Sequence, residues 1–318
     1  MKIIKFGGTS LQTPTLVNNA LEIIKNYQEK VIVVISAIGR KGFPYATDTL
    51  IDSLKEKHIS DKEFDRLVSI GETYASVFLS NELNKNQIPA YSLSFKEIGI
   101  NCNKDYSSGE ILSVNCERIK SLLSKFQVLI VPGFLAKSSE NEVISLGRGT
   151  SDFSAVVLAD ILGEKEVILY KDINGIYPTI QYPLVKLKCY ENLSYQEMLS
   201  LCDIKIPIIN KKAVEYAKDK NIDIIVKNFI TNDSFTRISP IASNKKVIGF
   251  LLVNNQYYLA TFYPDDVKNE IDDIFKKNHI FIKNYSKSNN YLSFIIASSQ
   301  ALLIRKIILK TYFSDLLR

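Results

Sequence analysis

Residues 3–10 read IIKFGGTS, and this stretch decides the fold. An apolar run breaks at Gly7 and Gly8, which are followed by two hydroxyl residues. The pattern predicts a short buried strand, a loop whose backbone can lie against a ligand, and a helix start that Thr9 or Ser10 caps. Exposed helix N–H groups favour an anion, and Lys5 adds a positive charge. A plain strand–turn–helix corner is the alternative interpretation of this stretch.

The following segments alternate between helix and strand. An amphipathic helix is predicted over residues 15–29, and the β-branched run 31–35 indicates a central parallel strand buried on both faces. Further strands are predicted at 128–134 and 166–170, whereas residues 101–113 are polar and are expected to be irregular. This order predicts an α/β protein whose ligands bind beyond the carboxyl ends of its strands, where the glycine-bearing loops lie.

Composition excludes several classes of function. The chain has 318 residues, enough for about two domains. No apolar run reaches the length of a membrane span and no export signal begins the chain, so we expect a cytoplasmic protein without a membrane partner. The net charge of +6 is spread along the chain, which disfavours a nucleic-acid partner. Four cysteines without C-x-x-C spacing and two isolated histidines predict no metal site.

Two further motifs carry candidate functional residues. Residues 146–155 read LGRGTSDFSA, a second glycine corner in which the planar guanidinium of Arg148 suits a carboxylate or a phosphate. The predicted helix 64–83 contains Gly71, which costs about 1 kcal/mol relative to alanine. We therefore expect another segment to approach the helix backbone there. Glu72 beside it is a candidate ligand for a cation, and a solvent-exposed glutamate is the alternative.

Three blocks in this order, KFGGTS, GRGxSD and DxxGIY, resemble the aspartate kinases of the amino-acid kinase family. The loop 36–50, the helical motif SIGE at 69–72 and the strand end VPGF at 131–134 agree with that pattern. The resemblance covers about residues 1–240. Within the family, this sequence is similar to the monofunctional enzymes of the diaminopimelate and lysine pathway. It implies a three-layer αβα sandwich of the carbamate kinase-like type over residues 1–240.

The C-terminal residues 245–318 follow a polar, turn-rich boundary at 232–243. They are predicted to form strands and helices in the order ββαββα. The expected elements lie at residues 247–253, 257–263, 265–277, 280–282, 291–296 and 299–317. This order resembles one ACT-like, ferredoxin-like α+β unit, whereas the family typically carries two. The resemblance implies a regulatory or dimerisation role and a homodimer or higher homo-oligomer. A plain α+β appendage is the alternative.

The resemblance also implies a reaction and a site. Aspartate kinases transfer the γ-phosphoryl group of ATP to the β-carboxylate of L-aspartate, and Mg²⁺ enters with the ATP. By resemblance, Lys5 contacts the transferred group and Asp152 orients Lys5. The residues expected on the aspartate side are Ser36, Thr47, Glu72 and Arg148. Those expected on the nucleotide side are Lys5, Gly7, Gly8, Ser10, Lys171, Asp172 and Tyr177.

The nucleotide-side motifs depart from the family pattern. Thr150 stands where glycine is usual, and Lys171 stands at the threonine of T-D-x-x-G-I-Y. The A-D-P-R segment that usually follows is not recognisable. The lysine of the family's G-A-K-V-L-H-P-R-A motif aligns with Pro207 in this sequence. We expect Pro207 to lie near the nucleotide. Candidate substitutes for the missing lysine are Lys205, Lys211 or Lys212.

These departures leave two hypotheses. Because a carboxylate is ionised near neutral pH, the reaction needs positioning and charge neutralisation rather than a general base. An active aspartate kinase is the first hypothesis. A weakened paralogue that binds an amino acid or acts as a regulatory subunit is the second. A kinase for another small acid, such as glutamate, fits the Thr47 and SIGE motifs less well.

Overall fold

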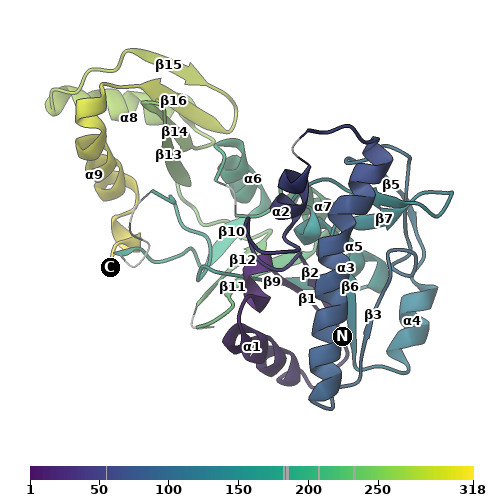
Figure 1. Ribbon diagram of the computed structural model, residues 1–318. Coiled ribbons are helices and arrows are strands. Elements are labelled where there is room, and N and C mark those ends of the chain that lie inside the picture. The colour runs from purple at the N-terminus through teal and green to yellow at the C-terminus, as the bar shows by residue number, and fades with distance from the viewer. Residues whose placement is uncertain (55, 182, 184–185, 207, 232–233) are drawn as a thin grey trace.

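The structure, a computed structural model, describes residues 1–54, 56–181, 183, 186–206, 208–231 and 234–318. An eight-stranded sheet of order β10-β12-β11-β9-β1-β2-β6-β3 forms its centre (Figure 1). Its strands are β1 (Lys2–Phe6), β2 (Val31–Ile35), β3 (Ala90–Ser92), β6 (Val128–Pro132), β9 (Glu166–Lys171), β10 (Asn192–Ser194), β11 (Asp223–Asn228) and β12 (Phe235–Ser239). All neighbours from β3 to β11 are parallel, and β12 is antiparallel to β11.

The strand register places three loops at one level of the sheet edge. Phe6 on β1 is paired with Ile35 on β2 and with Tyr170 on β9. Gly7, Ser36 and Lys171 are the next residues along these three adjacent strands. The motifs that the sequence singled out therefore meet at the carboxyl edge, as the parallel-sheet rule predicts.

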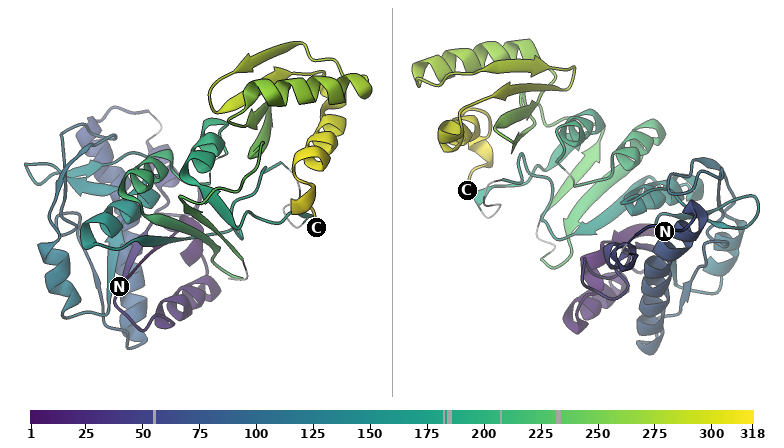
Figure 2. Two further views of the ribbon diagram at one scale, coloured as in Figure 1. Left: turned by 180° about the vertical axis from the view of Figure 1, so that it is seen from behind. Right: turned by 45° about the horizontal axis from the view of Figure 1, so that its top comes forward.

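Helices cover both faces of this sheet (Figure 2). One face carries α1 (Pro14–Lys25) and the C-terminal half of α3 (Asp61–Lys85). The other carries α4 (Glu117–Leu123), α5 (Ser151–Leu162), α6 (Tyr195–Asp203) and α7 (Lys211–Lys220). Every residue of β2 is buried, because side chains on both of its faces pack beneath helices. The predicted three-layer αβα sandwich is confirmed.

A small second sheet, of order β5-β4-β7-β8, lies beside the N-terminal half of α3. Its strands are β4 (Ile100–Cys102), β5 (Ile111–Val114), β7 (Leu135–Lys137) and β8 (Val143–Ser145). The expectation of an irregular segment at 101–113 was wrong, because that segment contributes to β4 and β5. Strands of only three and four residues give little periodic signal in a sequence. A short helix, α2 (Thr47–Ser53), completes this part of the molecule.

The C-terminal residues form a separate antiparallel sheet of order β13-β14-β16-β15. Its elements are β13 (Gly249–Val253), β14 (Gln256–Ala260), α8 (Pro264–Lys277), β15 (Asn284–Lys287), β16 (Tyr291–Ile295) and α9 (Ala301–Tyr312). The order ββαββα is confirmed, although the strand expected at 280–282 was wrong and lies at β15. The boundary expected at 232–243 contains β12, in which Thr236 and Ile238 alternate inward to join the larger sheet.

The segment after β9 packs against this C-terminal unit. The Phe250 backbone N–H donates to the Pro178 carbonyl at 2.8 Å, and the Gln181 side chain bonds both backbone groups of Leu252. The Tyr190 hydroxyl donates to the Ile248 carbonyl at 2.6 Å. Apolar side chains of both parts also belong to one continuous core. The segment that departs from the family's nucleotide motif is thus bound to the C-terminal sheet.

Gly71 is required by a close approach between α3 and the loop after β2. A Cβ atom at this position would lie 2.4 Å from the Tyr45 carbonyl oxygen and 2.7 Å from the Ala37 Cβ atom. Both distances are shorter than van der Waals contact, and the nearer atom belongs to backbone. The expectation that another segment approaches the helix backbone at Gly71 is confirmed. No helix among the described residues is long and apolar enough to cross a membrane.

We expect Gly71→Ala to lower the free energy of unfolding by about 1–3 kcal/mol, because the added methyl group displaces the loop. This expected loss of stability is opposite to the effect of helix propensity, which favours alanine over glycine by about 1 kcal/mol. Urea denaturation measures the difference. Thr73→Ala, at an exposed position of the same helix, is the matched control and should change stability little. A Gly71→Ala protein at least as stable as the parent would contradict the packing described.

Candidate active site

Two adjoining cavities lie at the carboxyl edge of β1, β2 and β9. The first, of about 380 Å³, is lined by Lys5, Gly7, Gly8, Thr9, Gly39, Arg40, Lys171, Asp172, Ile173, Ile180 and Ile208. The second, of about 230 Å³, is lined by residues that include Ser36, Thr47, Asp48, Glu72, Ser107, Ser145 and Arg148. Gly39 and Arg40 line both cavities, so the two share a wall.

A buried cluster of three charges forms the floor of the first cavity. Lys5 Nζ lies 3.0 Å from one carboxylate oxygen of Asp152, and Lys171 Nζ donates to the other at 2.8 Å. Burial alone would raise the pKa of Asp152, but the charges of Lys171 and Lys5 outweigh it and hold that pKa well below its usual range. Two cations and one anion leave a formal charge of +1 beside the cavity.

The glycine corner is held against the loop after β2. A Cβ atom at Gly8 would lie 2.5 Å from the Ala37 carbonyl oxygen, and the Gly39 N–H donates to the Gly8 carbonyl at 2.7 Å. Residues Gly8–Leu11 form a 3₁₀ turn, and Thr13 rather than Thr9 or Ser10 caps α1. Ser10 is buried and lines neither cavity. The bare backbone of Gly7 and Gly8 remains open to the first cavity.

Glu72 supplies a buried carboxyl group to the wall of the second cavity. One oxygen accepts a hydrogen bond from the Ala37 N–H at 3.0 Å, and the other has no hydrogen-bond partner among the described residues. Burial raises the pKa of Glu72 to about 8, against the opposing effects of the Ala37 N–H and the charge of Lys5. The alternative of a solvent-exposed glutamate was wrong. A half-satisfied buried carboxyl group is suited to a cationic ligand.

The other residues expected on the aspartate side also line the second cavity. Arg148 lies at its exposed mouth and forms an ion pair with Asp48. Thr47 is the first residue of α2, and Ser36 donates its hydroxyl to Ser151 at 3.1 Å. The cavity therefore offers a buried acid, an exposed guanidinium and hydroxyl groups.

Asp65 is a residue of this site that the sequence analysis missed. It is fully buried on α3, two turns before Glu72. Its carboxylate accepts hydrogen bonds from the backbone N–H and hydroxyl of Ser107 and from the backbone N–H of Ser145, at 2.8–3.1 Å. Ser107 and Ser145 line the second cavity. The helical spacing of seven residues between Asp65 and Glu72 was the available signal.

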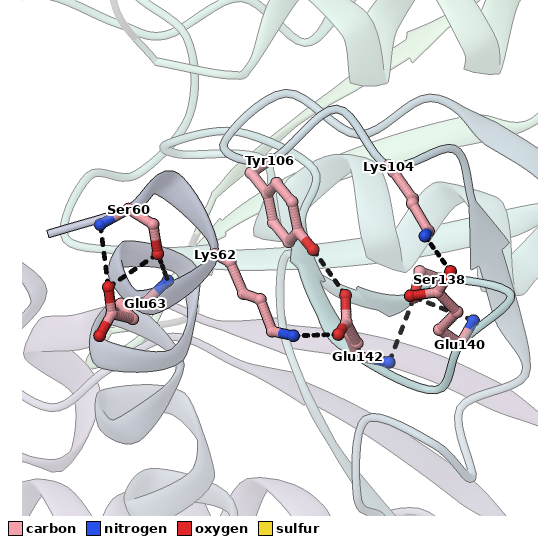
Figure 3. A network of polar contacts seen from close by, with 8 residues as sticks. All are labelled: Ser60, Lys62, Glu63, Lys104, Tyr106, Ser138, Glu140 and Glu142. Carbon is pink, nitrogen blue, oxygen red and sulfur yellow. Dashed lines mark hydrogen bonds and ion pairs between the residues drawn. The ribbon is translucent and has the colours of Figure 1, made fainter.

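A polar network on the outside supports the same wall (Figure 3). Glu142 binds Lys62 of α3 and the Tyr106 hydroxyl, and Lys104 forms an ion pair with Glu140. The Ser138 hydroxyl accepts the backbone N–H groups of Glu140 and Glu142 at 3.2 Å. The start of α3, the loop that carries Ser107 and the turn between β7 and β8 are thereby tied together.

The remaining nucleotide-side residues divide between the first cavity and the core. Asp172 lines the cavity and forms an ion pair with Arg40 at 2.8 Å. Tyr177 is 4% exposed, packs in the core shared with the C-terminal unit and lines neither cavity. Thr150 has φ of −87°, so its side chain causes no backbone strain, and its hydroxyl donates to the Gly147 carbonyl.

The candidate substitutes for the motif lysine lie elsewhere. Lys205, Lys211 and Lys212 do not line the first cavity, and Lys211 forms an ion pair with Asp203 at 2.6 Å. Pro207 lies outside the described residues. Within the part of the chain that the structure describes, no group of three or more His, Cys, Asp or Glu side chains is placed to hold a metal ion.

The comparisons with known proteins agree with this geometry. Aspartokinase 1 of Bacillus subtilis is 32% identical over 252 residues, which cover 77% of this chain and 62% of that protein. The aspartokinase of Helicobacter pylori is 33% identical over 239 residues, which cover 74% of this chain and 58% of that protein. The chain thus spans about 60% of the length of these curated relatives.

Solved structures show the same fold. A crystal structure of E. coli aspartokinase III in complex with aspartate and ADP has a TM-score of 0.66 at 16% identity and covers 100% of this chain and 84% of that one. The aspartate kinase of Synechocystis has a TM-score of 0.67 at 24% identity and covers 96% and 54%. The model of the amino acid kinase family matches residues 1–228, which contain both glycine corners and both cavities, and the chain therefore belongs to the amino acid kinase family.

Proposed function

We propose that this chain is an ATP-dependent aspartate kinase, which transfers the γ-phosphoryl group of ATP to the β-carboxylate of L-aspartate and forms 4-phospho-L-aspartate. This product opens the route to lysine, threonine, methionine and diaminopimelate. The observation that carries the proposal is the shared wall between a cationic, glycine-lined cavity and a cavity with a half-satisfied buried acid. The names of the curated relatives support the choice of aspartate.

On the nucleotide side, the bare backbone of Gly7 and Gly8 admits phosphate groups, and Lys5 contacts the transferred phosphoryl group. Asp152 holds the Lys5 ammonium group in place through the contact at 3.0 Å. Asp172 borders the nucleotide from the end of β9. The lysines and glycines of the cavity would hold an ATP complex with Mg²⁺, and the ion would supply further neutralisation of the phosphate charge.

On the aspartate side, Glu72 binds the ammonium group of the substrate and Arg148 binds its α-carboxylate. Thr47 and Ser36 provide hydroxyl contacts between them. An amino acid held at both ends directs its β-carboxylate toward the wall that the cavities share. The β-carboxylate is already ionised, so its attack on the γ-phosphorus requires correct positioning and no proton transfer.

A weakened paralogue is the second candidate function. The observation that favours it is the burial of Tyr177 in the core, because a residue expected beside the nucleotide is absent from the first cavity. Such a protein would bind aspartate, or serve as a regulatory partner, without efficient turnover. In either case we propose a homo-oligomer in the cytoplasm, with the C-terminal unit as an ACT-like dimerisation or regulatory domain.

An assay of ADP release in the presence of Mg-ATP separates the two candidates. We expect aspartate-dependent turnover that falls by about 10²-fold or more in Lys5→Ala, because a cation that stabilises the transferred group is lost. A thermal-shift titration with aspartate runs in parallel. A parent protein no faster than Lys5→Ala, with aspartate still raising its melting temperature, would refute the kinase and support the paralogue.

Arg148→Ala should raise the KM for aspartate by about 10- to 100-fold while changing the KM for ATP little, because one charge-assisted contact to the α-carboxylate is lost. Steady-state kinetics with each substrate varied in turn measure both constants. Arg66→Ala removes an exposed arginine that lines neither cavity and is the matched control. An equal rise in the two constants would show that the assignment of the cavities is wrong.

Aspartate affinity should rise with pH between about 6 and 8. In the free protein the pKa of Glu72 is raised to about 8, so the carboxyl group is mostly protonated at pH 7. The ammonium group of aspartate favours the carboxylate, so binding at pH 7 releases a proton. Calorimetry in two buffers of different ionisation enthalpy counts that proton. Glu72→Gln should lose most affinity and the pH dependence, whereas a flat profile in the parent would contradict this role.

A further inference from the structure

The first cavity contains a second lysine that its family motif does not supply. Lys171 is the last residue of β9, and it stands where the family pattern has threonine. On the adjacent strand, Lys5 is paired with Leu169, two residues before Lys171. Since strand residues two apart face the same way, Lys5 and Lys171 project from the same face of the sheet. That face is covered by α5, whose first turn carries Asp152.

One carboxylate serves both lysines. Asp152 contacts Lys5 at 3.0 Å with one oxygen and Lys171 at 2.8 Å with the other. The side chains of Asp152, Lys5 and Lys171 are 5%, 9% and 17% exposed, so solvent screens them little. The pair carries one more positive charge than its counter-ion, and both lysines line the cavity beside Gly7 and Gly8. A buried excess of cation facing bare backbone is suited to a ligand with several negative charges.

We propose that Lys171 is the second phosphate-binding cation of this enzyme and replaces the lysine that the motif around Pro207 lacks. The inference rests on the proposed kinase function and deepens it. Lys171 contacts the nucleoside triphosphate from β9 while Lys5 contacts it from β1, so the phosphates lie at the carboxyl edge of these two adjacent strands. Asp152 is then a positioning residue for both ammonium groups, rather than for Lys5 alone.

The other lysines considered from the sequence do not have this geometry. Lys205 and Lys212 are exposed and do not line the first cavity, and Lys211 is paired with Asp203. Burial lowers the pKa of Lys171, and the charge of Asp152 opposes that shift. A phosphate ligand would further favour the charged form. Lys171 on β9, the strand next to β1, therefore compensates for the lysine that the nucleotide motif lacks.

The test compares Lys171→Met, Lys171→Ala and Lys171→Arg with Lys205→Ala and Lys212→Ala. We expect Lys171→Met and Lys171→Ala to lower kcat by about 10²-fold or more, the size seen when one transition-state contact is removed. Their affinity for a non-hydrolysable ATP analogue with Mg²⁺ should fall at least tenfold, while the shift in melting temperature by aspartate stays unchanged. Lys171→Arg should retain part of both properties, and the two control variants should match the parent.

The outcomes distinguish this inference from the proposed function. Turnover by the parent together with parent-like kcat and analogue affinity in Lys171→Met would overturn the role of Lys171 and leave the kinase intact. No turnover by the parent would refute the kinase, and analogue binding would still decide the question for Lys171. Melting temperatures identify a variant that fails to fold. In that case Lys171→Thr, which restores the residue of the family pattern, takes its place, and a folded Lys171→Thr protein with kcat and analogue affinity equal to those of the parent would overturn the proposal.

Discussion

The carboxylate of Asp152, shared between Lys5 and Lys171, is the interaction on which the site depends. Charges buried together are tolerated only when each is paired, and here one anion pairs with two cations from adjacent strands. The parallel register of β1 and β9 brings both lysines to one face of the sheet. The first turn of α5 places Asp152 between them. The uncompensated positive charge faces a backbone without side chains. The sheet thus places a net positive charge beside the glycine corner with residues of its own strands.

Helix α3 has a comparable role for the second cavity. This helix carries Asp65, Gly71 and Glu72, which respectively bind the loop of Ser107, admit the loop after β2 and bind the Ala37 N–H of that same loop. Two segments distant in sequence therefore take their positions from one helix. The same helix buries the Glu72 carboxyl group with one oxygen that has no hydrogen-bond partner in the described part of the chain, and such burial costs free energy.

Much of the fold followed from local patterns. The run 31–35 was predicted as a central strand and is β2, and the two glycine corners lie at the carboxyl edge as expected. Errors occurred where the local signal was weak: β4 and β5 are only three and four residues long, and β12 lies in a polar segment, where the buried residues of the strand are Thr236, Ile238 and Ser239. Tyr177 was expected on the nucleotide side from the family resemblance, but it is buried in the core shared with the C-terminal unit.

The sequence alone determined the α/β class, the motif residues and the family resemblance, because hydrophobic periodicity and glycine corners are local properties of the chain. It also indicated that another segment approaches the helix at Gly71, and it named Glu72 as a candidate ligand for a cation. Only the tertiary structure decided that Lys171 rather than Lys205, Lys211 or Lys212 joins Lys5, that Asp65 holds the second cavity, and that Glu72 is buried. These facts depend on which strands are neighbours and which loops cross a helix, and such long-range contacts leave no pattern in the residues adjacent to them.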